Sequence, residues 1–329
     1  MTAPRFDILG IGNAVVDLLA RVPESFLSRH DMHKGAMRLC DAAEAARLAA
    51  ALPEVEEAGG GSAANTCAAA AALGSRVAFL GKVAADRLGE RFRADMTAAG
   101  VHYPLGPANS GLPTACCIVA VTPDGQRTMN TFLGASVAFA PEDVPAELVA
   151  ESRIVYLEGY LFDPPAAQAA FRRAAELSRA AGREVALSLS DPYCVDRHRA
   201  GFRAFVADSV DLLFANEAEI CSLYEEERFE AAAERARREV KLAALTRSEA
   251  GSLIFRGSET IRVQAHPTTV VDTTGAGDAY AAGFLHAYAA GRDLALCGRV
   301  ASLAAAEVIA HLGARPAPDL RAKAATLLG

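Results

Sequence analysis

Residues 272–288, DTTGAGDAYAAGFLHAY, contain the stretch that decides the fold: two glycines and an aspartate directly before a helix of small residues. Glycines in this position leave the first helical amides unpaired and let a ligand approach the backbone, and the helix dipole adds to the attraction for an anion. A phosphate bound there would lie beside Asp278. Its carboxylate can accept a proton from a substrate hydroxyl while the site neutralises the developing charge. Taken alone, the stretch is equally consistent with a capped helix in which Asp278 only stabilises the dipole.

Two further stretches carry polar side chains in apolar surroundings. Residues 59–65, GGGSAAN, also open a helix, and Asn65 offers donors and an acceptor that suit vicinal hydroxyls. A flexible turn into a packing helix is an equally good interpretation of that stretch alone. Asn13 and Asp17 follow the first predicted strand, and the lone carboxylate of Asp17 needs partners that a polyol would supply.

The rest of the chain alternates predicted strands with predicted helices, which indicates a parallel sheet covered on both faces. Insertions with strand character near 13–41 and 102–132 interrupt the alternation and predict a small separate sheet. The predicted strands lie at 6–12, 76–80, 153–157, 184–189, 210–214 and 242–246, with a hairpin at 251–263. The predicted helices lie at 61–73, 86–99, 165–181, 197–207, 216–223, 228–239, 277–290 and 293–311.

Composition excludes several classes of protein. The 329 residues carry a net charge of −7, from 33 basic and 40 acidic side chains, so a general nucleic-acid binder is not expected. No apolar run reaches the roughly 18 residues that cross a bilayer, and the N-terminus lacks the pattern of a secretory signal. The seven cysteines form no CxxC pair, which favours reduced thiols and a cytoplasmic protein.

Three common site patterns fail on spacing. Gly10-Ile11-Gly12 lacks the third glycine of a dinucleotide-binding fingerprint, because Val15 stands in its place. The residues between Gly74 and Gly81-Lys82 are too many for a Walker A loop, and no HExxH zinc motif is present. A dinucleotide-dependent dehydrogenase therefore remains only a weak alternative.

The assembled motifs resemble the ribokinase-like (PfkB) family of carbohydrate and nucleoside kinases over essentially the whole chain. The stretch GGGSAANT is similar to the first signature of that family and DTTGAGDAYAAGF to the second. Asn216-Glu217-Ala218-Glu219 matches its N-x-x-E motif, and Thr246-Arg247 with Gly251 resembles its nucleotide-contact strand and turn. The resemblance implies a single domain over residues 1–329 with a three-layer α/β/α fold, a mostly parallel central sheet and a small β-sheet lid formed by segments near 13–41 and 102–132.

The resemblance also implies roles for individual residues. Asp278 would be the catalytic base, and the amides of Gly275, Ala276 and Gly277 would form an anion hole. Arg127 would be a lid arginine that swings toward the phosphates. The hydroxyls of the acceptor would be held by Asn13, Asp17, Gly61 and Asn65.

On the nucleotide side, the resemblance implies ATP with Mg²⁺. Asn216 and Glu219 would organise Mg²⁺ and its waters, since hard oxygen ligands suit that ion. The nucleotide itself would contact Thr246, Arg247, Gly251 and Gly277. Family members often respond to a monovalent cation, and Asp272 and Thr274 are candidate ligands for K⁺.

Within the family, the segments GNAVVD (12–17), KGAM (34–37), QRTMNTFLGAS (126–136) and EGYLFDPP (158–165) are most similar to the adenosine kinase branch. An apolar wall for a nucleobase is expected from Val15, Phe132, Leu133, Tyr160 and Leu161. This predicts ATP-dependent phosphorylation of the 5′-hydroxyl of adenosine or a related nucleoside, giving AMP and ADP.

Two alternatives stay open. The first is a kinase for a sugar or sugar acid, such as a ribokinase, fructokinase or 2-keto-3-deoxygluconate kinase. The second is a non-catalytic nucleoside-binding protein on the same fold. The expected partners are a nucleoside or sugar acceptor and ATP, with no nucleic acid and no membrane. The chain is expected as a monomer or as a homodimer paired through the lid.

Overall fold

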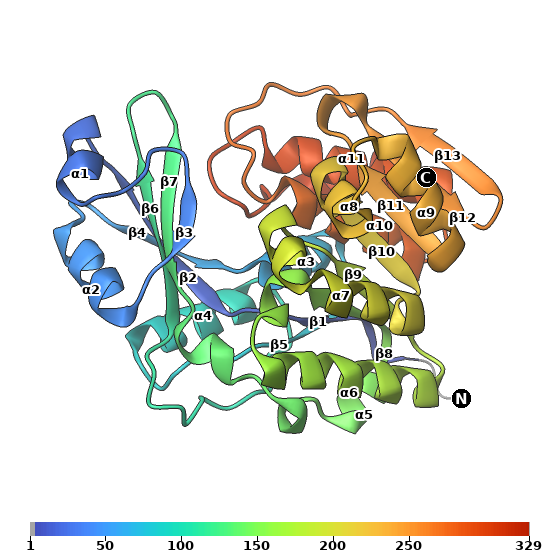
Figure 1. The fold of residues 1–329 in the computed structure, drawn as a ribbon, viewed down its shortest axis with the longest axis horizontal. Coiled ribbons are helices and arrows are strands. Elements are labelled where there is room, and N and C mark those ends of the chain that lie inside the picture. Colours follow the sequence, from blue (N-terminus) through green and yellow to red (C-terminus); the bar gives the residue numbers. More distant parts are fainter. Residues whose placement is uncertain (1–3, 329) are drawn as a thin grey trace.

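The computed structural model describes residues 4–328 and arranges them as two β-sheets, the larger of which has helices on both faces (Figure 1). The larger sheet has eight strands in the order β13-β12-β11-β10-β9-β8-β1-β5. Its strands from β5 to β11 run parallel, and β12 and β13 form an antiparallel hairpin at one edge. The strands are β1 Phe6–Ile11, β5 Val77–Leu80, β8 Ser152–Glu158, β9 Glu184–Ser188, β10 Leu212–Asn216, β11 Leu242–Thr246, β12 Ser252–Arg256 and β13 Glu259–Val263.

Alternate residues of these strands enter two separate cores, because successive side chains of a strand point to opposite faces. Ile8 and Tyr156 belong to one core, and Leu9 and Val155 belong to the other. The first core is closed by α3 Ser62–Leu73, α10 Ala276–Ala289, α11 Leu294–Val308 and α12 Leu320–Leu328. The second is closed by α5 Ala146–Ala150, α6 Pro165–Ala181, α7 Pro192–Ser209, α8 Glu217–Tyr224 and α9 Phe229–Glu239. The predicted three-layer α/β/α class is therefore confirmed.

The second sheet, called the small sheet below, has five strands in the order β3-β7-β6-β2-β4. They are β3 Met37–Leu39, β7 Arg127–Phe132, β6 Ala115–Val121, β2 Val15–Arg21 and β4 Glu56–Gly60. Helices α1 Glu24–Arg29, α2 Ala42–Ala51 and α4 Arg87–Ala98 pack their buried side chains into the same core as α3. In Figure 1 the small sheet stands beside the larger one, and the chain passes from β1 directly into β2.

Most predicted elements are confirmed, and the main errors are omissions. Helix α6 matches its predicted range, and α3 ends at Leu73, where it is capped by Gly74 with a left-handed φ of 106°. The predicted helix at 197–207 was placed too late: α7 begins at Pro192, because Asp191 accepts hydrogen bonds from the amides of Tyr193 and Cys194. Elements β4, α1, α2, α5 and α12 were not predicted. Among residues 4–328, no helix combines the length and apolar character needed to cross a membrane.

Candidate active site

A cavity of about 1120 Å³ lies between the carboxyl ends of the central strands, the N-termini of α3 and α10, and the small sheet. Ligand sites of open α/β sheets form at this end of the strands. The cavity is large enough for two organic ligands side by side. The predicted site residues that line it are Asn13, Asp17, Gly61, Asn65, Asn216, Glu219, Thr246, Thr274, Gly275, Ala276, Gly277 and Asp278.

Asp278 joins the two glycine-rich turns of the sequence. It lies in the first turn of α10, and it accepts hydrogen bonds from Ser62 Oγ at 2.6 Å and from Asn65 Nδ2 at 3.0 Å, both on α3. Burial raises the pKa of Asp278, while these two hydrogen bonds and the charge of Arg315 oppose the rise. A carboxylate with a raised pKa is a better proton acceptor, which is the property that a general base requires.

Residues 272–278, called the anion loop below, present free backbone amides to the cavity. Gly275 has a left-handed φ of 78°, and a Cβ there would lie 2.8 Å from Cβ of Ala314. Ala276 donates its amide to Thr273 O, whereas no acceptor within residues 4–328 takes the amides of Gly277 and Asp278. A Cβ on Gly277 would meet nothing within 4 Å, so a ligand has room to reach this backbone.

On the acceptor side, two side chains lack the donors that they need. No donor within residues 4–328 is hydrogen bonded to the carboxylate of Asp17, and burial raises its pKa to about 6, against the charges of Arg127 and Arg315. The amide oxygen Oδ1 of Asn65 is buried and has no hydrogen-bond partner among residues 4–328. A buried acceptor without a donor costs free energy, so both groups suit a ligand that carries hydroxyls.

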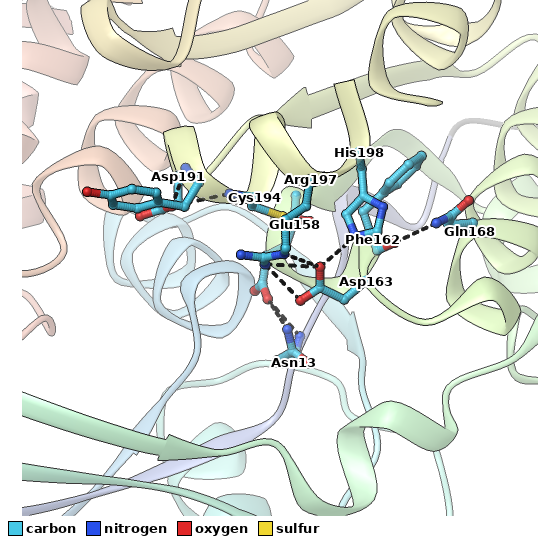
Figure 2. A network of polar contacts seen from close by, with 11 residues as sticks. Asn13, Glu158, Phe162, Asp163, Gln168, Asp191, Cys194, Arg197 and His198 are labelled. Carbon is cyan, nitrogen blue, oxygen red and sulfur yellow. Dashed lines mark hydrogen bonds and ion pairs between the residues drawn. The ribbon is translucent and has the colours of Figure 1, made fainter. Parts of the chain in front are cut away.

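Glu158, at the end of β8, is a buried acid that the sequence reasoning missed. Its carboxylate accepts from the Asn13 amide at 3.0 Å and from Asn13 Nδ2 at 2.7 Å (Figure 2). It also accepts from the Ala63 amide at 2.6 Å. It therefore fixes the junction of β1 and β2 against the first turn of α3. A Cβ on Gly12 would lie 2.4 Å from Oε2 of Glu158, which explains the glycine at that position. Burial raises the pKa of Glu158 to about 7.

Asn216 and Glu219 form a reciprocal cap at the start of α8. Asn216 donates from Nδ2 at 2.6 Å and from its amide at 2.9 Å to the two carboxylate oxygens, and Glu219 donates its amide to Asn216 Oδ1. Burial raises the pKa of Glu219 to about 7. Residues 4–328 contain no cluster of three His, Cys, Asp or Glu side chains that could hold a metal. The oxygen atoms of Asn216 and Glu219 are of the type that Mg²⁺ takes as ligands, directly or through its waters.

Two predicted nucleotide contacts lie outside the cavity wall. Arg247 pairs with Glu217 at 3.1 Å, and its guanidinium carbon lies 4.2 Å from the ring centre of Phe229. Gly251 takes a left-handed φ of 83° in the turn into β12, where a Cβ would lie 2.0 Å from Val263 O. Thr246 alone of the predicted strand-and-turn residues reaches the cavity.

The predicted K⁺ ligands are already occupied by protein donors. Asp272 accepts from the Thr274 amide and hydroxyl, from the Gly313 amide at 2.9 Å, and from Arg127, which also donates to Thr274 Oγ1 at 2.6 Å. Burial raises the pKa of Asp272, but these donors hold it below its usual value. A carboxylate has about four acceptor positions, and all are used here. The residues present therefore do not fit a K⁺ site on Asp272 while Arg127 occupies it.

The predicted apolar wall is partly present. Val15, Leu133 and Tyr160 line the cavity, whereas Leu161 is buried in the second core and Phe132 packs against the first core. Exposed apolar side chains that line the cavity and were not predicted are Met37, Leu39 and Tyr193.

A polar pair completes the wall near α7. Arg197 Nη2 lies 3.0 Å from both carboxylate oxygens of Asp163, and His198 Nε2 lies 2.7 Å from Oδ1 of the same carboxylate (Figure 2). Asp163 and Arg197 both line the cavity. The pair gives this end of the cavity hydrogen-bonding groups beside its apolar side chains.

A buried carboxylate beside acceptor groups without donors and free backbone amides is the arrangement that suits a phosphotransferase with an alcohol group as acceptor. Residues 36–320 match the model of the pfkB family carbohydrate kinases, and the chain belongs to this family.

Similar proteins include both nucleoside and sugar kinases. The chain is 49% identical to an adenosine kinase from Sinorhizobium meliloti, with a TM-score of 0.91 and coverage of 98% of this chain and 99% of that one. It is 46% identical to a probable sugar kinase from Rhizobium etli, with a TM-score of 0.92 and the same coverage. It is 25% identical to adenosine kinase 1 of Arabidopsis thaliana, over 95% of this chain and 97% of the relative.

Proposed function

We propose that the protein is an ATP-dependent kinase that transfers the γ-phosphoryl group of ATP to the 5′-hydroxyl of adenosine or a related nucleoside, giving AMP and ADP. The observation that carries the proposal is the convergence of Ser62, Asn65 and Asp278 in one cavity with Asp17. This convergence supports a reaction in which a proton acceptor, hydroxyl-binding groups and free backbone amides act around the same space.

In the proposed reaction, the acceptor hydroxyl gives its proton to the carboxylate of Asp278. Its oxygen forms a bond to the γ-phosphorus as the bond from that phosphorus to the bridging oxygen of ADP breaks. The free amides of Gly277 and Asp278 stabilise the negative charge on the phosphoryl oxygens. Asn13, Asp17, Gly61 and Asn65 hold the ribose, and Mg²⁺, when bound near Glu219, neutralises the charge of the triphosphate.

The small sheet is proposed to be the lid of this site. It supplies Val15, Asp17, Met37, Leu39 and other side chains to the cavity wall. Closure of such a sheet would exclude water, which otherwise competes with the acceptor for the phosphoryl group. Arg127 would then lie near the phosphates, since it already reaches Thr274 of the anion loop.

A nucleoside suits the cavity better than a free sugar does. Val15, Met37, Leu39, Leu133 and Tyr160 give the acceptor side an apolar wall that a base would cover and a small sugar would leave wet. The 49% identity to an adenosine kinase supports the same acceptor. The 46% identity to a probable sugar kinase makes a sugar the second candidate.

A coupled assay of ADP release tests the proposal with adenosine, inosine, guanosine, ribose, fructose and 2-keto-3-deoxygluconate as acceptors. We expect turnover with adenosine at the highest kcat/KM. Turnover of a free sugar alone would refute the nucleoside acceptor and leave the kinase reaction in place. Binding of adenosine by calorimetry with no turnover of any acceptor would instead identify a non-catalytic binding protein.

A further inference from the structure

Three consecutive residues after α11, Gly313, Ala314 and Arg315, together contact two separate parts of the proposed site. The amide of Gly313 donates to Asp272, and Ala314 packs against Gly275, both in the anion loop. Arg315 reaches away from the anion loop to residues 59–65, called the acceptor turn below. We call residues 313–315 the strap, because they join the anion loop to the acceptor turn.

The shortest contacts of Arg315 are to backbone carbonyls, and its Nη2 also lies 3.9 Å from Sδ of Met96. Its Nε and Nη2 donate to Gly59 O at 3.1 and 3.0 Å, and its Nη1 donates to Ala64 O at 3.2 Å. Gly59 is held from its other side as well, because its amide donates to Asp95 Oδ2 at 2.8 Å. A planar guanidinium with donors in a fixed fork can serve two carbonyls at once, which the single ammonium of a lysine cannot do with the same geometry.

The acceptor turn is the part of the site that most needs such support. Gly59 pairs with Val16 of β2, and a Cβ on Gly60 would lie 2.7 Å from the carboxylate oxygens of Asp17. Ala64 is followed by Asn65, which holds Asp278. Movement of this turn would therefore displace the acceptor groups relative to the base, and catalysis is sensitive to displacements of about 1 Å.

The charge of Arg315 is not neutralised by a direct partner. No carboxylate within residues 4–328 lies within ion-pair distance of its guanidinium, although Asp17, Asp95 and Asp278 act on it from farther away. A part-buried guanidinium whose donors go to uncharged groups keeps its full positive charge. That charge acts on the neighbouring carboxylates. The other titratable groups that act on or respond to Asp278 are Asp17 on β2, Tyr156 and Glu158 on β8, Tyr160 after β8, and Glu219 on α8.

We propose that Arg315 is a positioning residue of the phosphoryl-transfer site, which fixes the acceptor turn against the anion loop and places a positive charge near Asp17 and Asp278. The inference rests on the proposed kinase function, because it assigns Arg315 a part in that reaction. Arg315 acts through Gly59, Ala64 and the two carboxylates, and it is not among the described residues that line the cavity.

The test compares Arg315→Met, Arg315→Lys and the control Arg292→Met, which removes an exposed arginine from the turn between α10 and α11. Arg315→Met should lower kcat by at least about tenfold and move the acid limb of the kcat–pH profile to higher pH, because Asp278 loses a nearby cation. Arg315→Lys should keep the acid limb of the wild type, because lysine retains the positive charge. Its kcat should be lower than that of the wild type, because lysine lacks the planar set of donors that binds both carbonyls. Arg292→Met should match the wild type in both.

Hydrogen exchange of the peptide covering residues 59–65 gives a readout that needs no turnover. Exchange should become about tenfold faster in Arg315→Met and stay unchanged in the control. Wild-type kcat, acid limb and exchange in Arg315→Met would overturn the proposal. If circular dichroism shows that Arg315→Met does not fold, a wild-type kcat in Arg315→Lys overturns the positioning role. Absence of turnover in the wild type refutes the kinase function, and the exchange measurement still decides whether Arg315 holds the turn.

Discussion

Asp278→Asn separates catalysis from binding, because the structure lets asparagine keep both hydrogen bonds of the aspartate. In one orientation of the new amide, its oxygen accepts from Asn65 Nδ2 and its nitrogen donates to Ser62 Oγ, whose hydroxyl is free to rotate. The two helix N-termini therefore stay joined. Only the capacity to accept a proton from the acceptor is lost.

The size of the effect follows from that difference. General-base catalysis contributes about 10²- to 10⁴-fold, so kcat should fall by about 10³-fold, or roughly 4 kcal/mol of transition-state stabilisation. The neutral amide makes weaker hydrogen bonds with Ser62 and Asn65 than the carboxylate does. It also removes the free-energy cost of burying a charge, and this burial is what raises the pKa of Asp278. The affinity for the acceptor should therefore change by less than about tenfold, or 1.4 kcal/mol.

The assay is steady-state ADP release with the preferred acceptor, together with calorimetric titration of that acceptor. Asp293→Asn is the matched control, since Asp293 also stands at a helix N-terminus and accepts the Leu296 amide at 2.8 Å. A kcat of Asp278→Asn within tenfold of the wild type would remove Asp278 from the mechanism. A large loss of acceptor affinity with an unchanged kcat would show that Asp278 binds the acceptor and does not act as the base.

Three further predictions concern charge and backbone. Burial raises the pKa of Glu158 and of Glu219 to about 7, so the folded chain binds these protons more tightly than the unfolded chain. Unfolding free energy, measured with urea, should therefore fall between pH 6 and pH 8 by about 1 kcal/mol for each carboxyl, and a rise would contradict this. Because donors from Arg127, Thr274 and Gly313 together fill the acceptor positions of Asp272, exchange of K⁺ for tetramethylammonium should change wild-type kcat by less than about twofold, and a tenfold loss would refute the occupancy. Gly61→Ala should cost about 3 kcal/mol in urea unfolding, because its φ is 95° and its Cβ would lie 2.2 Å from Asn13 O. Gly100→Ala, with positive φ but open space, should cost about 1 kcal/mol, and equal losses would show that the clash is not the cause.

The fold was predictable where local pattern and final environment agree. The apolar strands of the central sheet are buried on both faces, so their composition alone distinguishes them, and α6 is bounded by Pro165 and a left-handed Gly182. Strand β4, with the sequence EEAGG, carries no residue that favours strands and forms because it pairs with β2. The sequence does indicate the start of α7 at Pro192, because Asp191-Pro192 is an N-cap residue followed by a proline. The prediction of a helix from residue 197 overlooked this pair.

The site residues also fall into two groups, those that the sequence indicates and those that only the structure reveals. Asp278 and Asn65 stand beside glycines at helix starts, so their neighbours in sequence indicated their chemistry. Glu158 and Arg315 have no such neighbours, and their partners lie far away in the chain: Asn13 is 145 residues from Glu158, and Gly59 is 256 residues from Arg315. Only the folded structure brings those donors and acceptors together. A buried acid at the end of an apolar strand was the one local signal that could have drawn attention to Glu158.

The charges of the cavity explain why these distant residues matter. Asp17, Glu158, Glu219 and Asp278 place four carboxyl groups around a space that must also receive a triphosphate, and burial raises the pKa of each of them. Mutual repulsion alone would favour protonation of these acids, and a protonated Asp278 is no base. The N-termini of α3 and α10, which meet at Asp278, supply partial positive charge from one side, and Arg315 supplies a full charge from another. The helix dipoles, Arg127 and Arg315 together fall short of the charge of four carboxylates and a triphosphate, so we expect the nucleotide to bring a divalent cation, and Glu219 is the group that we propose to lie beside it.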